Sequence, residues 1–81
     1  SEAHLEPFIS IFPNPVLTTA NIETNLDDYE ISIYSAGGKL MILKDASMQT
    51  LIDMSAFTSG LYFVKITTKK GLQITKRIIK N

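Results

Sequence analysis

The chain has 81 residues, of which 44% are hydrophobic and 20% are charged, and its eight basic residues balance its eight acidic ones. This length fits one small domain, and an apolar composition without net charge excludes an intrinsically disordered chain. The absence of cysteine excludes disulfides and thiolate sites, and the apolar runs are far shorter than the roughly 20 residues of a transmembrane helix. We therefore expect a single small domain without membrane insertion.

Seven short apolar segments follow one another along the chain, separated by turn residues at intervals of roughly ten residues. The predicted strands are residues 8–12, 20–24, 29–34, 40–44, 48–53, 61–67 and 72–80. No apolar stripe at helical spacing is sustained, so we expect no helix longer than one turn. The pattern predicts an all-β fold, a seven-stranded immunoglobulin-like β-sandwich.

The segments between the strands contain residues typical of turns. The prolines of residues 13–15 end the first strand, because each fixes φ and removes a backbone donor. Residues 35–39 predict a tight hairpin whose glycines can adopt positive φ, and residues 69–71 predict another. Residues 54–60 form a longer corner, in which Met54 and Phe57 are expected to close one end of the core. Period-two alternation predicts a core built mainly from Ile22, Ile31, Ile33, Ile52, Phe57, Tyr62, Val64 and Ile66.

Charge is distributed unevenly along the chain. Residues 1–30 contain six acidic residues and no Lys or Arg, whereas residues 65–81 contain six basic residues and no acid. In one interpretation the two ends lie side by side in a β-domain and attract each other. In another, an acidic partner recognises the basic C-terminal segment. Nucleic-acid binding is the weakest interpretation, because no aromatic platform or glycine-rich phosphate loop accompanies the bases.

The sequence offers no set of catalytic residues. His4 is the only histidine and precedes the first predicted strand, and there is no cysteine, so no nucleophilic triad is predicted. Asp45 and Asp53 flank the fifth predicted strand, and we expect them to cap turns rather than to act as an acid–base pair. Asp27, Asp28 and Glu30 share a turn and contain the oxygen ligands that Ca²⁺ prefers, but they lack the glycine and the spacing of a dedicated loop. We expect no enzyme activity, no cofactor and no metal site.

Four segments contain motifs in a fixed order: residues 11–15 (IFPNP), 31–40 (ISIYSAGGKL), 52–66 (IDMSAFTSGLYFVKI) and 75–80 (TKRIIK). They resemble the YPNP, IYDLSGKLV, IDLSxLPSGIYLVKI and TKKIIK motifs of the C-terminal sorting domains of the type IX secretion system, found in Bacteroidetes-type Gram-negative bacteria. Ser35, Ala36 and Thr58 depart from the residues that the family prefers. The resemblance assigns structural roles to Pro13, Asn14, Pro15, Gly38, Lys39, Gly60, Tyr62, Val64 and Lys65.

The resemblance implies that residues 8–81 form a sorting domain and that residues 1–7 are a linker from an upstream cargo protein. It also implies that the type IX translocon and shuttle components recognise the domain as an export signal. A sortase-like cysteine protease would cleave upstream of it. The cargo would pass through the periplasm to the cell surface or the extracellular space.

The candidate recognition residues lie in the terminal strand and the turn before it. A basic last strand at a sheet edge offers unpaired backbone groups to a partner strand and charge to steer it, although the same charges could serve only to prevent aggregation between sheets. The candidates are Lys69, Lys70, Lys76, Arg77 and Lys80.

A second interpretation is an immunoglobulin-like adhesion, carbohydrate-binding or structural spacer module of a surface protein. A binding module of this kind would expose aromatic side chains on one face, for which Tyr29, Tyr34 and Phe63 are the candidates.

Overall fold

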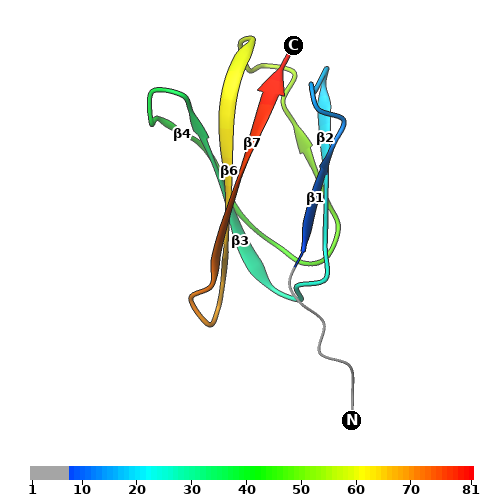
Figure 1. Cartoon of the computed structure of the whole chain (residues 1–81), viewed down its shortest axis with the longest axis vertical. Helices are drawn as coiled ribbons and strands as arrows, with labels where there is room; N and C mark the ends of the chain where they lie inside the picture. The colour runs from blue at the N-terminus through cyan, green and yellow to red at the C-terminus, as the bar shows by residue number, and fades with distance from the viewer. Residues whose placement is uncertain (1–7) are drawn as a thin grey trace.

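The computed structural model describes residues 8–81, which form two antiparallel sheets packed face to face, with seven strands and no helix (Figure 1). The predicted all-β sandwich is confirmed, and the predicted strand ends are within two residues of the observed ones. The proposed linker, residues 1–7, and His4 lie outside the described residues. The strands are β1 (Ile9–Phe12), β2 (Thr19–Thr24), β3 (Tyr29–Ser35), β4 (Leu40–Ala46), β5 (Thr50–Asp53), β6 (Gly60–Thr68) and β7 (Gln73–Lys80).

The two sheets divide the strands three to four. One sheet has the order β1-β2-β5 and the other β4-β3-β6-β7, so β1, β5, β4 and β7 are edge strands. In constant-type immunoglobulin domains the fourth strand joins the sheet of the first, second and fifth. Here β4 pairs with β3 instead. No helix in the described part of the chain is long and apolar enough to cross a membrane.

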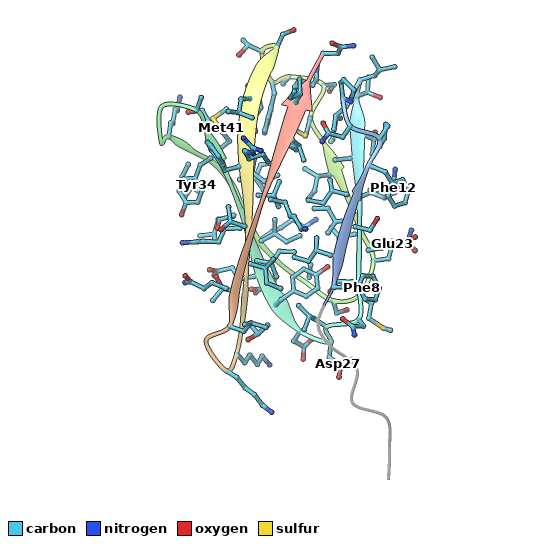
Figure 2. The ribbon with its side chains drawn as sticks, in the orientation of Figure 1. Phe8, Phe12, Glu23, Asp27, Tyr34 and Met41 are labelled. Carbon is cyan, nitrogen blue, oxygen red and sulfur yellow. The ribbon has the colours of Figure 1, made fainter. Side chains whose placement is uncertain are left out.

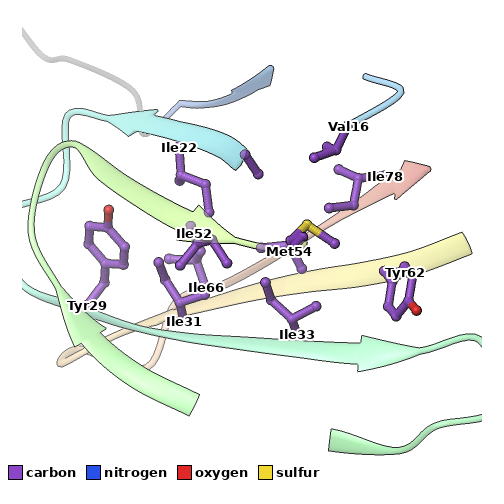
Figure 3. Close-up of a cluster of buried hydrophobic side chains, with 12 residues drawn as sticks. Val16, Ile22, Tyr29, Ile31, Ile33, Ile52, Met54, Tyr62, Ile66 and Ile78 are labelled. Atoms are coloured by element: carbon purple, nitrogen blue, oxygen red, sulfur yellow. The ribbon is translucent and has the colours of Figure 1, made fainter. Parts of the chain in front are cut away.

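The core lies between the sheets and is made by alternate residues of the strands (Figure 3). Ile33 of β3 is directly opposite Val64 of β6, and Ile31 is opposite Ile66, so the two central strands of the larger sheet direct the same residues inward. Burial of each such side chain stabilises the fold by about 1.5–3 kcal/mol. The buried cluster is Val16, Ala20, Ile22, Tyr29, Ile31, Ile33, Ile52, Met54, Tyr62, Val64, Ile66 and Ile78.

One predicted core residue is only partly buried. Phe57 packs against the cluster from the corner between β5 and β6, with its ring centroid 5.2 Å from that of Tyr62. It covers the end of the core rather than entering it. Met54, predicted to close the same end, is fully buried. The corner is held by Tyr62, whose hydroxyl donates to the Thr58 carbonyl at 2.7 Å, as a tyrosine corner does in immunoglobulin-like sandwiches.

The β3–β4 hairpin requires one of its two glycines to adopt a left-handed conformation. Gly38 has φ 92°, a conformation that L-residues rarely adopt, whereas Gly37 does not have positive φ. The hairpin predicted from these glycines is confirmed, and it uses positive φ at Gly38. Ser35 closes the turn, because its carbonyl accepts from the Gly38 N–H at 2.9 Å and its Oγ accepts from the Lys39 N–H at 3.1 Å.

Candidate functional site

The predicted recognition strand, β7, lies at the edge of the four-stranded sheet, where its neighbouring strand is β6. Cross-strand partners share a face of the sheet, so Lys76 faces the sandwich interior with its partner Val64, whereas Arg77 faces outward with Phe63. Alternate residues of an edge strand direct their backbone N–H and C=O groups away from the sheet. The expected position of the basic strand at a sheet edge is confirmed.

The C-terminal end of that edge is closed by a contact that we call the terminal clasp, formed by Asn14 and Val16 with Ile79 and Asn81. The Ile79 N–H donates to Asn14 Oδ1 at 3.0 Å, and the Ile79 carbonyl accepts from the Val16 N–H at 2.7 Å. The Asn81 N–H donates to the Val16 carbonyl at 2.8 Å, and the Val16 side chain is fully buried. Residues 13–15 thus carry the chain from one sheet to the last strand of the other.

The clasp divides the edge of β7 into two parts. Since the backbone groups of Ile79 point away from β6, alternation directs those of Arg77 and Thr75 the same way. The strand edge is therefore closed at Ile79 and open from residue 73 to residue 77. No local sequence signal predicts the clasp, because Asn14 and Ile79 are 65 positions apart.

The candidate bases do not form one patch. Lys69 and Lys70 lie in the exposed turn between β6 and β7, whereas Lys80 is at the other end of β7 (Figure 1). The eight residues of this strand span about 26 Å at 3.3 Å per residue. Within the described residues the one ion pair joins Lys69 Nζ to Asp28 Oδ2 at 3.5 Å. Both side chains are exposed, so the pair contributes little to stability; it joins the turn between β2 and β3 to the turn between β6 and β7.

Lys80 is a correction to the expected set of accessible bases. Lys80 is only 7% exposed, and its Nζ donates to the Asn81 carbonyl at 3.0 Å. It points into the sandwich beside the clasp because it shares the inward-facing row of β7 with Ile78. Lys69, Lys70, Lys76 and Arg77 are exposed. The recognition role of all five residues stays a prediction.

Lys76 combines an inward orientation with an exposed side chain, because β7 lies at the edge of the sandwich. Lys44 has the same arrangement on the opposite edge strand, β4, where its partner is the buried Ile31. A charge directed inward on an edge strand opposes the addition of an apolar strand. Both open edges of the larger sheet therefore carry this protection.

The remaining motif residues have structural positions. Gly60 begins β6 with φ 147°, and Tyr62 and Val64 enter the core from that strand. Lys65 points outward, and its ammonium lies 5.6 Å from the ring centroid of Tyr34, within reach of a cation–π interaction.

Two of the three candidate aromatics share one surface. Tyr34 and Phe63 are directly opposite each other on the outward face of the four-stranded sheet, and both are partly exposed. Figure 2 shows Tyr34 pointing away from the three-stranded sheet, on the side of the molecule opposite Phe12. Tyr29 is buried instead, and its hydroxyl donates to the Met48 carbonyl at 2.9 Å.

The carboxylates have local roles. Among residues 8–81 no three His, Cys, Asp or Glu side chains are placed to hold a metal ion together, and this includes Asp27, Asp28 and Glu30. Asp53 is the last residue of β5 and accepts a hydrogen bond from the Ser55 N–H at 2.9 Å. This bond, together with one from the Ser55 side chain, holds the pKa of the Asp53 carboxyl below its ordinary value of 3.8.

Comparison with known proteins identifies the family. The family model for the secretion system C-terminal sorting domain matches residues 10–81, which include all four motif segments and all seven strands except the first residue of β1. A search of the curated proteins found no match. Domains of this family are sorting signals rather than catalysts. The chain belongs to the family of type IX secretion system C-terminal sorting domains.

Proposed function

We propose that this domain is the export signal of a larger cargo protein and that translocon and shuttle components recognise it as a folded domain. A sortase-like cysteine protease then cleaves the chain upstream of it, after transit through the periplasm. The observation that supports this most directly is the family match over residues 10–81. Such a domain directs export across the outer membrane, toward the cell surface or the extracellular space.

The recognition element in this proposal is the segment from Lys69 to Lys80. It contains the open part of the β7 edge, where the exposed Lys76 and Arg77 lie. A partner strand that adds to this edge pairs with the outward-directed backbone groups, and strand addition is a common mode of peptide recognition. The inward-pointing Lys76 disfavours an apolar strand and favours an acidic one. The charges therefore select the partner and accelerate its encounter.

The export signal is tested with a fusion of residues 1–81 to a periplasmic reporter protein, in a strain that has the translocon. We expect export of the unmodified fusion and partial loss with Lys76→Gln and Arg77→Gln, because these changes remove charge and keep the backbone edge. Lys44→Gln is the matched control, since this lysine has the same orientation on the other edge strand. A fusion that stays in the periplasm contradicts the export proposal. Full export of the double variant contradicts the assignment of the terminal bases.

Deleting residues 75–81 is a stronger perturbation, because it removes both edge pairing and charge. It also removes the buried Ile78 and half of the terminal clasp. Loss of export by this variant is therefore interpreted only beside its circular dichroism spectrum. A folded deletion variant that is still exported excludes the terminal strand as the recognition element.

A further inference from the structure

The outward face of the four-stranded sheet carries exposed or partly exposed apolar side chains from all four strands: Leu40, Leu43, Tyr34, Leu61, Phe63 and Ile79. Cross-strand register places Leu40, Tyr34, Phe63 and Arg77 in one row across all four strands. The adjacent row is Leu43, Ser32, Lys65 and Thr75, and Leu61 lies beside Ile79 on the other side. We call the following residues the outer apolar face: Tyr34, Leu40, Leu43, Leu61, Phe63, Ile79, Lys65 and Arg77.

When one face of an antiparallel sheet is in contact with water, the residues that point to that face are ordinarily polar. The far end of this same face follows the rule, with a row of Asp45, Glu30, Thr67 and Gln73. The outer apolar face does not, since Leu43 is 56% exposed and Ile79 48% exposed. Ser32, which lies between Leu43 and Lys65 in its row, is buried and therefore adds almost no polar surface there. Contiguous exposed apolar surface of this kind marks interaction sites.

We propose that the outer apolar face docks a partner protein whose contact surface is apolar at its centre and acidic at its border. The centre supplies two aromatic rings, and aromatic residues and arginine are the side chains most enriched where binding energy concentrates. This inference rests on the proposed function and names a surface of the export signal beyond the terminal strand.

The charges on this face decide the chemistry of the occupant. Lys65 and Arg77 both belong to it, and it contains no acidic residue, because Glu30 and Asp45 lie in the polar row at the far end. The Lys65 ammonium lies 5.6 Å from the Tyr34 ring centroid and makes no ion pair within the described residues, so it can pair with a carboxylate of the partner. A second copy of the chain is the poorer occupant, because a symmetric contact would bring these bases of both copies into the same interface.

The export fusion tests this surface with a matched pair of double variants. Phe63→Ser with Leu43→Ser removes apolar area from the outer apolar face and leaves every base in place. Phe12→Ser with Leu51→Ser makes the same chemical change on the outward face of the other sheet, where both side chains flank Asn21. We expect export to fall at least about tenfold with the first pair and to persist with the second, as for truncation of interface hot spots.

Three further measurements complete the test. If Phe63→Ser unfolds the domain, Leu43→Glu and Leu51→Glu replace the two double variants, because these leucines are 56% and 59% exposed. Leu43→Glu should then reduce export, and Leu51→Glu should not. Arg77→Glu should reduce export more than Lys44→Glu. Sedimentation of the 81-residue chain should show a monomer.

The outcomes separate this inference from the proposed function. An unmodified fusion that is not exported overturns both. Export of the unmodified fusion together with equal export of the two matched sets overturns the docking surface alone. A dimer that Phe63→Ser with Leu43→Ser dissociates also overturns it, because the occupant is then a second copy.

Discussion

Ile33 is the residue at which the structure makes its most quantitative prediction. Its side chain is fully buried at the centre of the larger sheet, opposite Val64 on one side and Ile42 on the other. Removing buried methyl groups loses their transfer free energy and leaves a cavity. We expect Ile33→Val to destabilise the domain by about 0.5–1.5 kcal/mol and Ile33→Ala by about 2–5 kcal/mol.

These destabilisations are large relative to the total free energy of unfolding of the domain. At about 0.05–0.15 kcal/mol per residue, an 81-residue domain has a free energy of unfolding of about 4–12 kcal/mol, and here no disulfide adds to it. A domain of this size loses about 4–8 °C in Tm for each kcal/mol. Ile33→Val should therefore lower the Tm by about 2–12 °C, and Ile33→Ala by at least about 8 °C.

Urea unfolding followed by circular dichroism measures both variants, and an unchanged m-value shows that the denatured state is unaltered. Leu43→Ala is the control, because this leucine lies on the outward face of the neighbouring strand and should change stability by no more than about 0.5 kcal/mol. If Ile33→Ala is no more destabilising than Leu43→Ala, Ile33 is not a core residue. The register of β3 is then wrong, since a slip of one residue exchanges the two faces of a strand.

Three further predictions concern the clasp and the carboxylates. Asn14→Ala should lower stability by about 0.5–1.5 kcal/mol and speed hydrogen exchange of the Ile79 amide, which loses its side-chain acceptor. Asp45→Lys should raise stability by about 0.2–1 kcal/mol in urea unfolding at low salt, because Asp45 is directly opposite Glu30 on β3 and like charges repel. Asp53 should titrate below 3.8 by NMR, because the folded state lowers its pKa. Its contribution to stability is therefore present above that pH and lost as the pH falls through the folded pKa.

Each of these predictions has a contrary result. Unchanged exchange at Ile79 in Asn14→Ala would mean that the clasp bond does not form in solution. A gain for Asp45→Lys that persists undiminished in about 1 M salt would mean that charge is not its cause. An Asp53 carboxyl that titrates at or above 3.8 would mean that the turn at Ser55 is open.

The strands, their inward faces and most of the core follow from the sequence. Alternation of side chains is a property of each strand by itself, so the pattern in residues 61–67 is sufficient to place Tyr62, Val64 and Ile66 inside. The requirement for glycine at Gly38 is also local, because it follows from the positive φ of a single turn residue. Phe57 is less buried than its predicted core position, because its location depends on the path of a corner rather than on the alternation of a strand.

Only the tertiary structure decided which strands are neighbours and which edges stay open. The clasp of Asn14 on Ile79, and the burial of Val16 and Lys80 beside it, depend on segments from opposite ends of the chain. The pairing of Tyr34 with Phe63 likewise depends on β3 lying next to β6. The pattern of a single strand determines which side of it faces the core. It contains no information about which strand lies beside it, and a recognition surface is built from such neighbours.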